Sequence, residues 1–154
     1  MTYSKVNPVS IAAGVIVIIS VFLPWVEIPI LGGPNLIDVT RFMRGVGAFA
    51  GSEGVLLSWI FVAIVLLVLG GGIVGLFRSR AGGGMAIAGL LVFTVLVVTL
   101  QLELEQMLES FGLGTHVDLL AFAGIGYWVG WVGAIVSVFA NKIARPKEVN
   151  TAEQ

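Results

Sequence analysis

The sequence contains no cysteine, and only 11% of its 154 residues are charged. Without cysteine the chain forms no disulfide and offers no thiol for redox chemistry. With 58% hydrophobic residues and a mean hydropathy of +1.06, the composition excludes an ordinary soluble domain. These absences together indicate a membrane protein.

Charge is missing altogether from four long apolar runs, which make up most of the chain. A helix needs about 20 mostly apolar residues to cross the hydrocarbon of a bilayer, or about 17 at the least. Its backbone must also be fully hydrogen-bonded there, so we interpret each run as a transmembrane helix. A cleaved signal peptide is the alternative for the first run, which is long and is followed by no small-residue cleavage site. The runs cover residues 6–26, 55–77, 85–100 and 119–140.

The few charged residues are segregated along the chain. Six of the eight basic residues lie near the N-terminus, between the second and third runs, or after the fourth: Lys5, Arg78, Arg80, Lys142, Arg145 and Lys147. Seven of the nine acidic residues lie in the other two loops: Glu27, Asp38, Glu53, Glu103, Glu105, Glu109 and Asp118. Because Lys and Arg are retained on the cytoplasmic side, this predicts a multi-pass protein of the cell membrane with cytoplasmic N- and C-termini.

The first outer loop is expected to contain a short helix. Asn35 can cap a helix over residues 36–44, which Gly45 would end. Its apolar face, Leu36 to Met43, would rest on the membrane surface or on the top of the bundle. Residues 27–31 contain Pro29 and are at best an edge strand.

The second outer loop predicts an extension of the third helix. Apolar residues after position 100 follow a helical period, with glutamates on the other side. The third helix should therefore continue to residue 111, about 16 Å beyond the membrane, although a strand over 100–105 is the alternative. The candidate contact face on this extension consists of Leu104, Met107, Leu108 and Phe111. Thr115 and Asp118 resemble a capping box, so the fourth helix should also begin outside the membrane.

These elements predict an all-α fold, a left-handed four-helix transmembrane bundle. It would have a long first outer loop and an outward-extended hairpin of the third and fourth helices. The short connection at residues 78–83 makes the second and third helices antiparallel neighbours. Residues 1–143 would form one domain, and residues 144–154 a disordered cytoplasmic tail.

Small residues recur at helical spacing inside the runs. Helices in lipid associate through close packing of small side chains, because the lipid is as apolar as they are. The stripe in the fourth run either packs inside the monomer, which is the favoured interpretation, or faces another subunit. The candidate packing residues are Gly71, Gly75, Gly126, Gly130 and Ala134.

All four tryptophans fall in the outer half of the predicted bundle. Trp25 and Trp59 fit a belt of interfacial aromatic anchors. Trp128 and Trp131, with Tyr127, lie deeper in the fourth run, where they pack beneath the loops or line a cavity.

Residues for chemistry are scarce. No ionisable residue lies within a run, which disfavours a pump or an ion-coupled transporter. His116 is the only histidine, and one His with Asp118 is far short of a metal-ligand set. No nucleophile–base pair, phosphate loop or cofactor motif occurs, so we predict a protein that is not an enzyme and binds neither cofactor nor metal. The scattered basic residues give no support to nucleic-acid binding.

Two resemblances rest on particular segments. The Phe22-Leu23-Pro24-Trp25 end of the first run, followed by three further spans, resembles many small uncharacterised bacterial and archaeal membrane proteins. The general layout is similar to the claudin-like four-helix proteins of cell junctions, as is the segment Gly126-Tyr127-Trp128-Val129-Gly130-Trp131. The claudin Gly-Leu-Trp and cysteine signature is absent, so this resemblance implies the architecture and no functional residue.

The predicted function is therefore that of a non-catalytic membrane protein, structural or accessory. It would act in the lipid bilayer through helix–helix and extracellular contacts with copies of itself or with another membrane protein. The alternative is a subunit of a small homo-oligomeric channel or transporter, lined by Thr94, Thr99 and Ser137. A third hypothesis is lipid binding near Trp128 and Trp131.

Overall fold

The computed structural model describes residues 7–27, 32–49, 51–112 and 118–143. Within these ranges the chain forms five α-helices packed as a bundle, one short 3-10 helix and no sheet, which confirms the predicted all-α class. The elements are α1 (Pro8–Ser20), α2 (Leu36–Gly47), α3 (Gly51–Phe77), α4 (Ser79–Ser110), the 3-10 helix η1 (Leu119–Phe122) and α5 (Ile125–Ile143).

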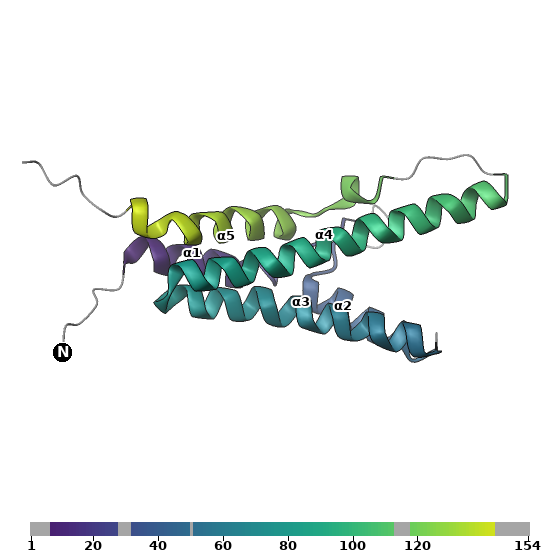
Figure 1. Ribbon diagram of the computed structural model, residues 1–154, viewed down its shortest axis with the longest axis horizontal. Coiled ribbons are helices and arrows are strands. Elements are labelled where there is room, and N and C mark those ends of the chain that lie inside the picture. Colours follow the sequence, from purple (N-terminus) through teal and green to yellow (C-terminus); the bar gives the residue numbers. More distant parts are fainter. Residues whose placement is uncertain (1–6, 28–31, 50, 113–117, 144–154) are drawn as a thin grey trace, which may run out of the picture.

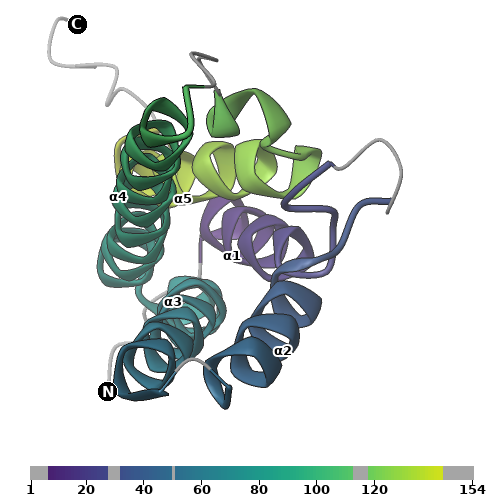
Figure 2. The same cartoon turned by 90° about the vertical axis from the view of Figure 1, so that its right-hand side faces the viewer.

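Four of the helices surround a common core, and α2 lies outside them. α1 packs against α3 and α5, and α4 packs against the same two helices, so α1 and α4 occupy opposite corners. α2 packs against α3, as the view along the bundle shows (Figure 2). α3 and α4 are long and apolar enough to cross a membrane, whereas α1 and α5 are shorter apolar helices.

Glycines let the helices approach backbone to backbone at one end of the bundle. A Cβ atom added at Gly71 of α3 would lie 2.6 Å from the Ala86 backbone nitrogen of α4. A Cβ added at Gly14 of α1 would lie 2.8 Å from the carbonyl oxygen of Gly72. No side chain larger than hydrogen fits at such distances. Gly71 and Gly14 therefore allow α3 to lie close to α4 and to α1.

Three consecutive glycines in α4 have three different surroundings. Gly82 meets the α3 backbone at Gly75, Gly83 meets α5 at Val138, and Gly84 has open space around it. The prediction of a connection over residues 78–83 is therefore wrong, since α4 already begins at Ser79 and only Arg78 separates it from α3. Glycine lowers helix propensity, but tight packing on two sides outweighs that cost here.

Polar side chains join the helices at this same end. The Ser10 hydroxyl donates to the carbonyl of Gly75 (2.6 Å), which links α1 to α3. The Asn7 amide donates to the carbonyl of Ala140 (2.9 Å), so the start of α1 lies beside the end of α5. The predicted antiparallel pairing of the second and third helices is visible as the hairpin of α3 and α4 (Figure 1).

The first apolar run is helical for only 13 residues. The prediction that it stays helical to residue 26 is wrong, because Pro24 has no N–H to donate and disfavours the helical conformation before it. The backbone at Trp25 instead forms hydrogen bonds with two other segments of the chain. The Trp25 N–H donates to the Pro34 carbonyl (3.0 Å), and the Trp25 carbonyl accepts from the Gly124 N–H (2.9 Å). Of the predicted edge strand, residues 28–31 lie outside the described ranges.

The fourth apolar run is broken as well. Its start is η1, whose N-terminus is capped by the Asp118 carboxylate, and α5 begins only at Ile125. The prediction of one helix over residues 119–140 is therefore wrong at its outer end. At that end the chain forms backbone hydrogen bonds with residues 24–27. The Glu27 N–H, for example, donates to the Phe122 carbonyl (2.8 Å). Thr115 of the predicted capping box and His116 lie outside the described residues, as does the tail 144–154.

Two helical predictions in the outer loops are confirmed. α4 continues without a break to Ser110, which excludes the alternative strand over 100–105. The Asn35 side chain caps α2 by accepting from the Asp38 N–H (2.9 Å). The prediction that Gly45 ends this helix is wrong, because α2 runs on to Gly47, which packs against the backbone of Gly54 in α3.

Candidate functional site

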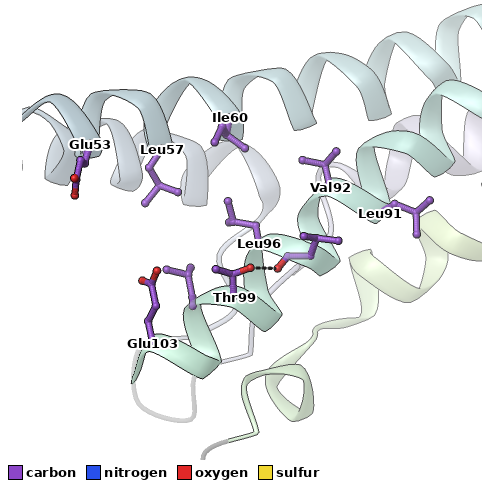
Figure 3. A pocket seen from close by; sticks show the side chains of 11 residues that line it. Glu53, Leu57, Ile60, Leu91, Val92, Leu96, Thr99 and Glu103 are labelled. Carbon is purple, nitrogen blue, oxygen red and sulfur yellow. Dashed lines mark hydrogen bonds between the residues drawn. The ribbon is translucent and has the colours of Figure 1, made fainter. Parts of the chain in front are cut away.

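A groove lies between α3 and α4 in the halves of these helices that are farthest from Arg78, called here the outer halves. It has a volume of about 680 Å³ and is open along its side. α3 contributes one wall and α4 the other, as the close view shows (Figure 3). The residues lining it are Glu53, Gly54, Leu57, Ile60, Leu91, Val92, Val95, Leu96, Thr99, Leu100 and Glu103.

The groove exists because the two helices separate away from their turn. Near Arg78 the glycines hold the α3 and α4 backbones in contact, whereas farther out the facing residues are Leu57, Ile60 and Leu96. These larger side chains keep the backbones apart. On its other side α3 is held close to α2 by the contact of Gly47 with Gly54, which draws this half of α3 away from α4.

The outer end of the groove is acidic. Glu53 and Glu103 stand on opposite walls at this end, and their side chains point toward one another (Figure 3). Both side chains are exposed, and neither has an ion pair or hydrogen bond with another described residue. The third polar group, the Thr99 hydroxyl, donates to the Val95 carbonyl of its own helix (2.9 Å). The remaining lining is apolar apart from the backbone of Gly54.

Glu53 and Glu103 are far apart in the sequence, but their spacing from the turn indicates that they face each other. Each lies 25 residues from Arg78, the residue between α3 and α4. In an antiparallel hairpin, residues equally far from the turn come opposite one another. Placing the turn at Arg78, rather than spreading it over residues 78–83, would have brought the two carboxylates together.

The predicted packing residues all lie against other segments of the same chain. Gly71 faces α4, and Gly75 lies near the Ser137 hydroxyl of α5. In α5, a Cβ added at Gly126 would lie 2.6 Å from the Trp25 ring, and one at Gly130 would lie 3.2 Å from the Ser20 hydroxyl oxygen. Ala134 is fully buried. The small-residue stripe of α5 is thus covered from within the chain.

The four tryptophans divide into two groups. Trp25 is fully buried, so the prediction that it is an interfacial anchor is wrong. Its indole N–H donates to the Ser20 carbonyl (2.7 Å). Trp131 is half-buried against the core, whereas Trp59 and Trp128 are exposed. The rings of Phe93 and Tyr127 pack on Trp25 at 5.0 and 6.0 Å between centroids. This aromatic cluster fills the outer part of the core.

The candidate contact face on α4 is largely exposed. Met107 and Phe111 are 58% and 69% exposed, Leu104 is exposed, and Leu108 is half-buried. The apolar face predicted on α2 packs against the bundle, one of the two places expected for it, because Leu36 and Thr40 are buried there. The outward residues of α2 and its C-terminal turn are instead Phe42, Val46 and Phe49.

The three hydroxyls proposed to line a pore lie in different places. The Ser137 hydroxyl is buried and donates to the Ser79 carbonyl (2.9 Å). Thr94 donates to the Leu90 carbonyl and shares a second hydrogen bond with the Tyr127 hydroxyl (2.8 Å). Only Thr99 faces an open space, the α3–α4 groove.

Among the described residues no group of three or more His, Asp or Glu side chains is placed to hold a metal ion. Comparisons of the chain with protein-family models, with curated proteins and with solved structures found no match. Proposals about function therefore depend on the geometry of the chain itself.

Proposed function

We propose that the chain is a multi-pass membrane protein in which α1, α3, α4 and α5 cross the bilayer as a left-handed bundle. The support is the outward surface of these helices. Only 33% of the apolar stretch of α3 and 22% of the apolar stretch of α4 is buried inside the protein, whereas the core helices of a soluble protein are mostly buried. Large apolar side chains point outward from all four helices, including Ile19, Leu66, Val95 and Val132. Lipid is the solvent that suits such a surface.

α1 and α5 reach across the bilayer with the help of non-helical chain. α1 rises about 20 Å over its 13 residues, short of the hydrocarbon thickness of about 30 Å. Residues 21–27 continue outward, and their polar backbone groups bond to residues 34–36 on one side and 122–126 on the other. Backbone without helical hydrogen bonds is tolerated at membrane depth where it is buried and paired inside the protein.

The charged residues support an orientation with both termini in the cytoplasm. Arg78 and Arg80 lie at the α3–α4 turn, and Lys142 lies in the last turn of α5 at the same end of the bundle. Glu53, Glu103 and Glu109 lie toward the opposite end. Positive residues are retained inside, so the groove and the free end of α4 face outward.

In this setting the protein acts without catalysis, as a structural or accessory subunit that binds another membrane protein or a second copy of itself. One observation carries this proposal: α4 projects past the other helices (Figure 1) and keeps apolar side chains exposed on its projecting end, chiefly Met107 and Phe111. Exposed apolar residues on a part of the chain that lies in water indicate an interaction surface.

A homo-oligomeric channel is less well supported. A pore between copies needs polar groups on the outside of the monomer, but Ser137 is buried and its hydroxyl is bonded within the chain. Reconstituted protein is accordingly expected to pass no ions, and a conductance that depends on Thr99 would reverse the preference between the two functions.

Site-specific photocrosslinking in the native membrane tests the contact proposal. A photoreactive amino acid at Met107 or Phe111 should give one discrete heavier species after illumination. The matched control is Gln106, an exposed residue of the same helix turn that points about 100° away from Met107. Leu108→Glu should remove the species without loss of the folded protein. Equal crosslinking from position 106, or none from 107 and 111, would overturn the proposal.

A further inference from the structure

The α3–α4 groove has the dimensions of a small-molecule site. Its volume of about 680 Å³ falls within the roughly 300–1,000 Å³ of typical ligand pockets. Leu91 and Glu103 are 12 residues apart on α4, a rise of about 18 Å. A single extended alkyl chain can lie along this length.

The lining divides the groove into an apolar part and a charged end. Leu91, Val92 and Ile60 line the deeper part, toward the middle of the bundle, whereas Glu53 and Glu103 stand at the outer end (Figure 3). A ligand that follows this division has a hydrocarbon tail and one polar head. In the proposed orientation the tail lies at the depth of the outer-leaflet hydrocarbon and the head lies at the membrane surface.

The sign of the charge at the outer end selects the head group. Two carboxylates that face each other repel, and no basic side chain lines the groove to offset them. Among the described residues, Arg41 near this end of the groove forms an ion pair with Asp38 of its own helix, α2 (3.7 Å), and not with either glutamate. Glu53 also lies in the first turn of α3, where the helix dipole favours a negative side chain. A cation at this end of the groove would be attracted by both carboxylates and would offset their repulsion.

We propose that the groove binds a single-chain amphipathic cation, an alkylammonium ion. Its alkyl chain lies along Leu57, Ile60 and Val92, and its ammonium group lies between Glu53 and Glu103. The lipid around the protein is as apolar as the walls of the groove. The walls therefore determine how well the alkyl chain fits, and the carboxylates contribute most of the preference for the groove over the lipid. The proposal shares with the proposed function the membrane location of α3 and α4, and it does not depend on any contact of Met107 or Phe111.

Photolabelling with matched amphiphiles tests this site. The full chain is placed in nanodiscs of phosphatidylcholine and illuminated with dodecylamine that carries a diazirine at the chain end; labelled residues are then located by mass spectrometry. Labelling should saturate and should concentrate on the Leu91 end of the groove. Unlabelled dodecylamine should compete at least tenfold better than dodecanol, and dodecanoic acid should compete worst. The three compounds have twelve-carbon chains, and their heads are positive, neutral and negative, respectively.

Variants separate the carboxylates from general charge effects. Glu53→Gln combined with Glu103→Gln should remove the tenfold preference for the amine, while Glu109→Gln, on the same helix outside the groove, should keep it. Val95→Trp should fill the groove and lower labelling by dodecylamine. Thermal unfolding of each variant in the same nanodiscs shows whether it is folded.

Labelling spread evenly over all outward faces, equal competition by dodecanol, or an equal effect of Glu109→Gln would overturn the proposal. Crosslinking at Met107 is a separate readout, so this site and the protein contact can fail independently.

Discussion

Substituting Gly82 by alanine should separate two helices that now touch through their backbones. Gly82 of α4 packs on the backbone of α3 at Gly75 and Gly71, so closely that a methyl group has no room. The helix in which it lies offers its own control two residues away. Apart from the adjoining backbone of its own helix, no described atom lies within 4 Å of the position that a Cβ at Gly84 would take. Both substitutions add the same methyl group to the same helix turn, but only one adds it at a helix contact.

The size of the effect follows from the distances. Carbon atoms pack best at about 3.5–4.0 Å, so α3 and α4 would have to part by roughly 1 Å to accept the methyl group of Gly82→Ala. A gap of that size costs the contacting atoms about a quarter to a half of their dispersion energy. We expect a loss of about 3 kcal/mol in the free energy of unfolding, at the upper end for overpacking, or roughly 100-fold in the folded-to-unfolded ratio. Gly84→Ala should be neutral or stabilising by up to about 1 kcal/mol, because alanine favours the helix.

Reversible unfolding in mixed micelles of dodecyl maltoside and dodecyl sulfate measures both variants under one condition. The circular dichroism signal of the helices reports the folded fraction as the share of dodecyl sulfate rises. If Gly82→Ala and Gly84→Ala unfold at the same detergent composition, the α3 and α4 backbones are not in contact and the explanation of the glycine runs is wrong. A loss of stability in Gly84→Ala alone would contradict it in the same way.

Three further experiments test other parts of the structure. Because the chain has no cysteine, Glu109→Cys should react with a membrane-impermeant maleimide on intact cells, and Arg80→Cys only after permeabilisation; the reverse pattern would contradict the proposed orientation. Trp25→Phe removes a buried indole and its hydrogen bond and should cost about 2–4 kcal/mol in the same unfolding assay, whereas the exposed Trp59→Phe should cost under about 0.5 kcal/mol. Ser137→Ala removes the hydroxyl bonded to the α3–α4 turn and should cost about 1 kcal/mol in that assay, and no measurable loss would contradict that role.

Local features predicted the parts of the fold that depend on local interactions. The helical period of the residues after position 100 predicted the extension of α4, because one face of a helix repeats within a few residues whatever the rest of the chain does. Asn35 predicted the start of α2 for the same reason, since a cap acts on the next turn of the helix. The length and apolarity of the second and third runs likewise predicted α3 and α4, the two helices long enough to cross a membrane.

The candidate groove was only partly within reach of the sequence. The two glutamates that close it are 50 residues apart and become neighbours only through the tight turn at Arg78. Its apolar walls use the same Leu, Ile and Val residues as any membrane helix, so nothing in their type distinguishes a groove from a packed or lipid-facing surface. Whether such residues touch depends on how far the two helices separate, and that is set by Gly71 and Gly82 at one end and by α2 at the other.

By itself, the sequence determined an all-α chain with few charges, two apolar helices long enough to cross a membrane, and the continuation of α4 beyond its apolar part. Only the tertiary structure decided that α1 ends at Ser20, that Trp25 lies in the core, and that Gly82 and Gly83, rather than Gly84, are the contact points of α4. The physical reason is common to all three. An apolar run can satisfy its backbone as a helix or by pairing with a distant segment, and a small or aromatic residue fits many neighbours, so the outcome depends on which segments the folded chain brings together.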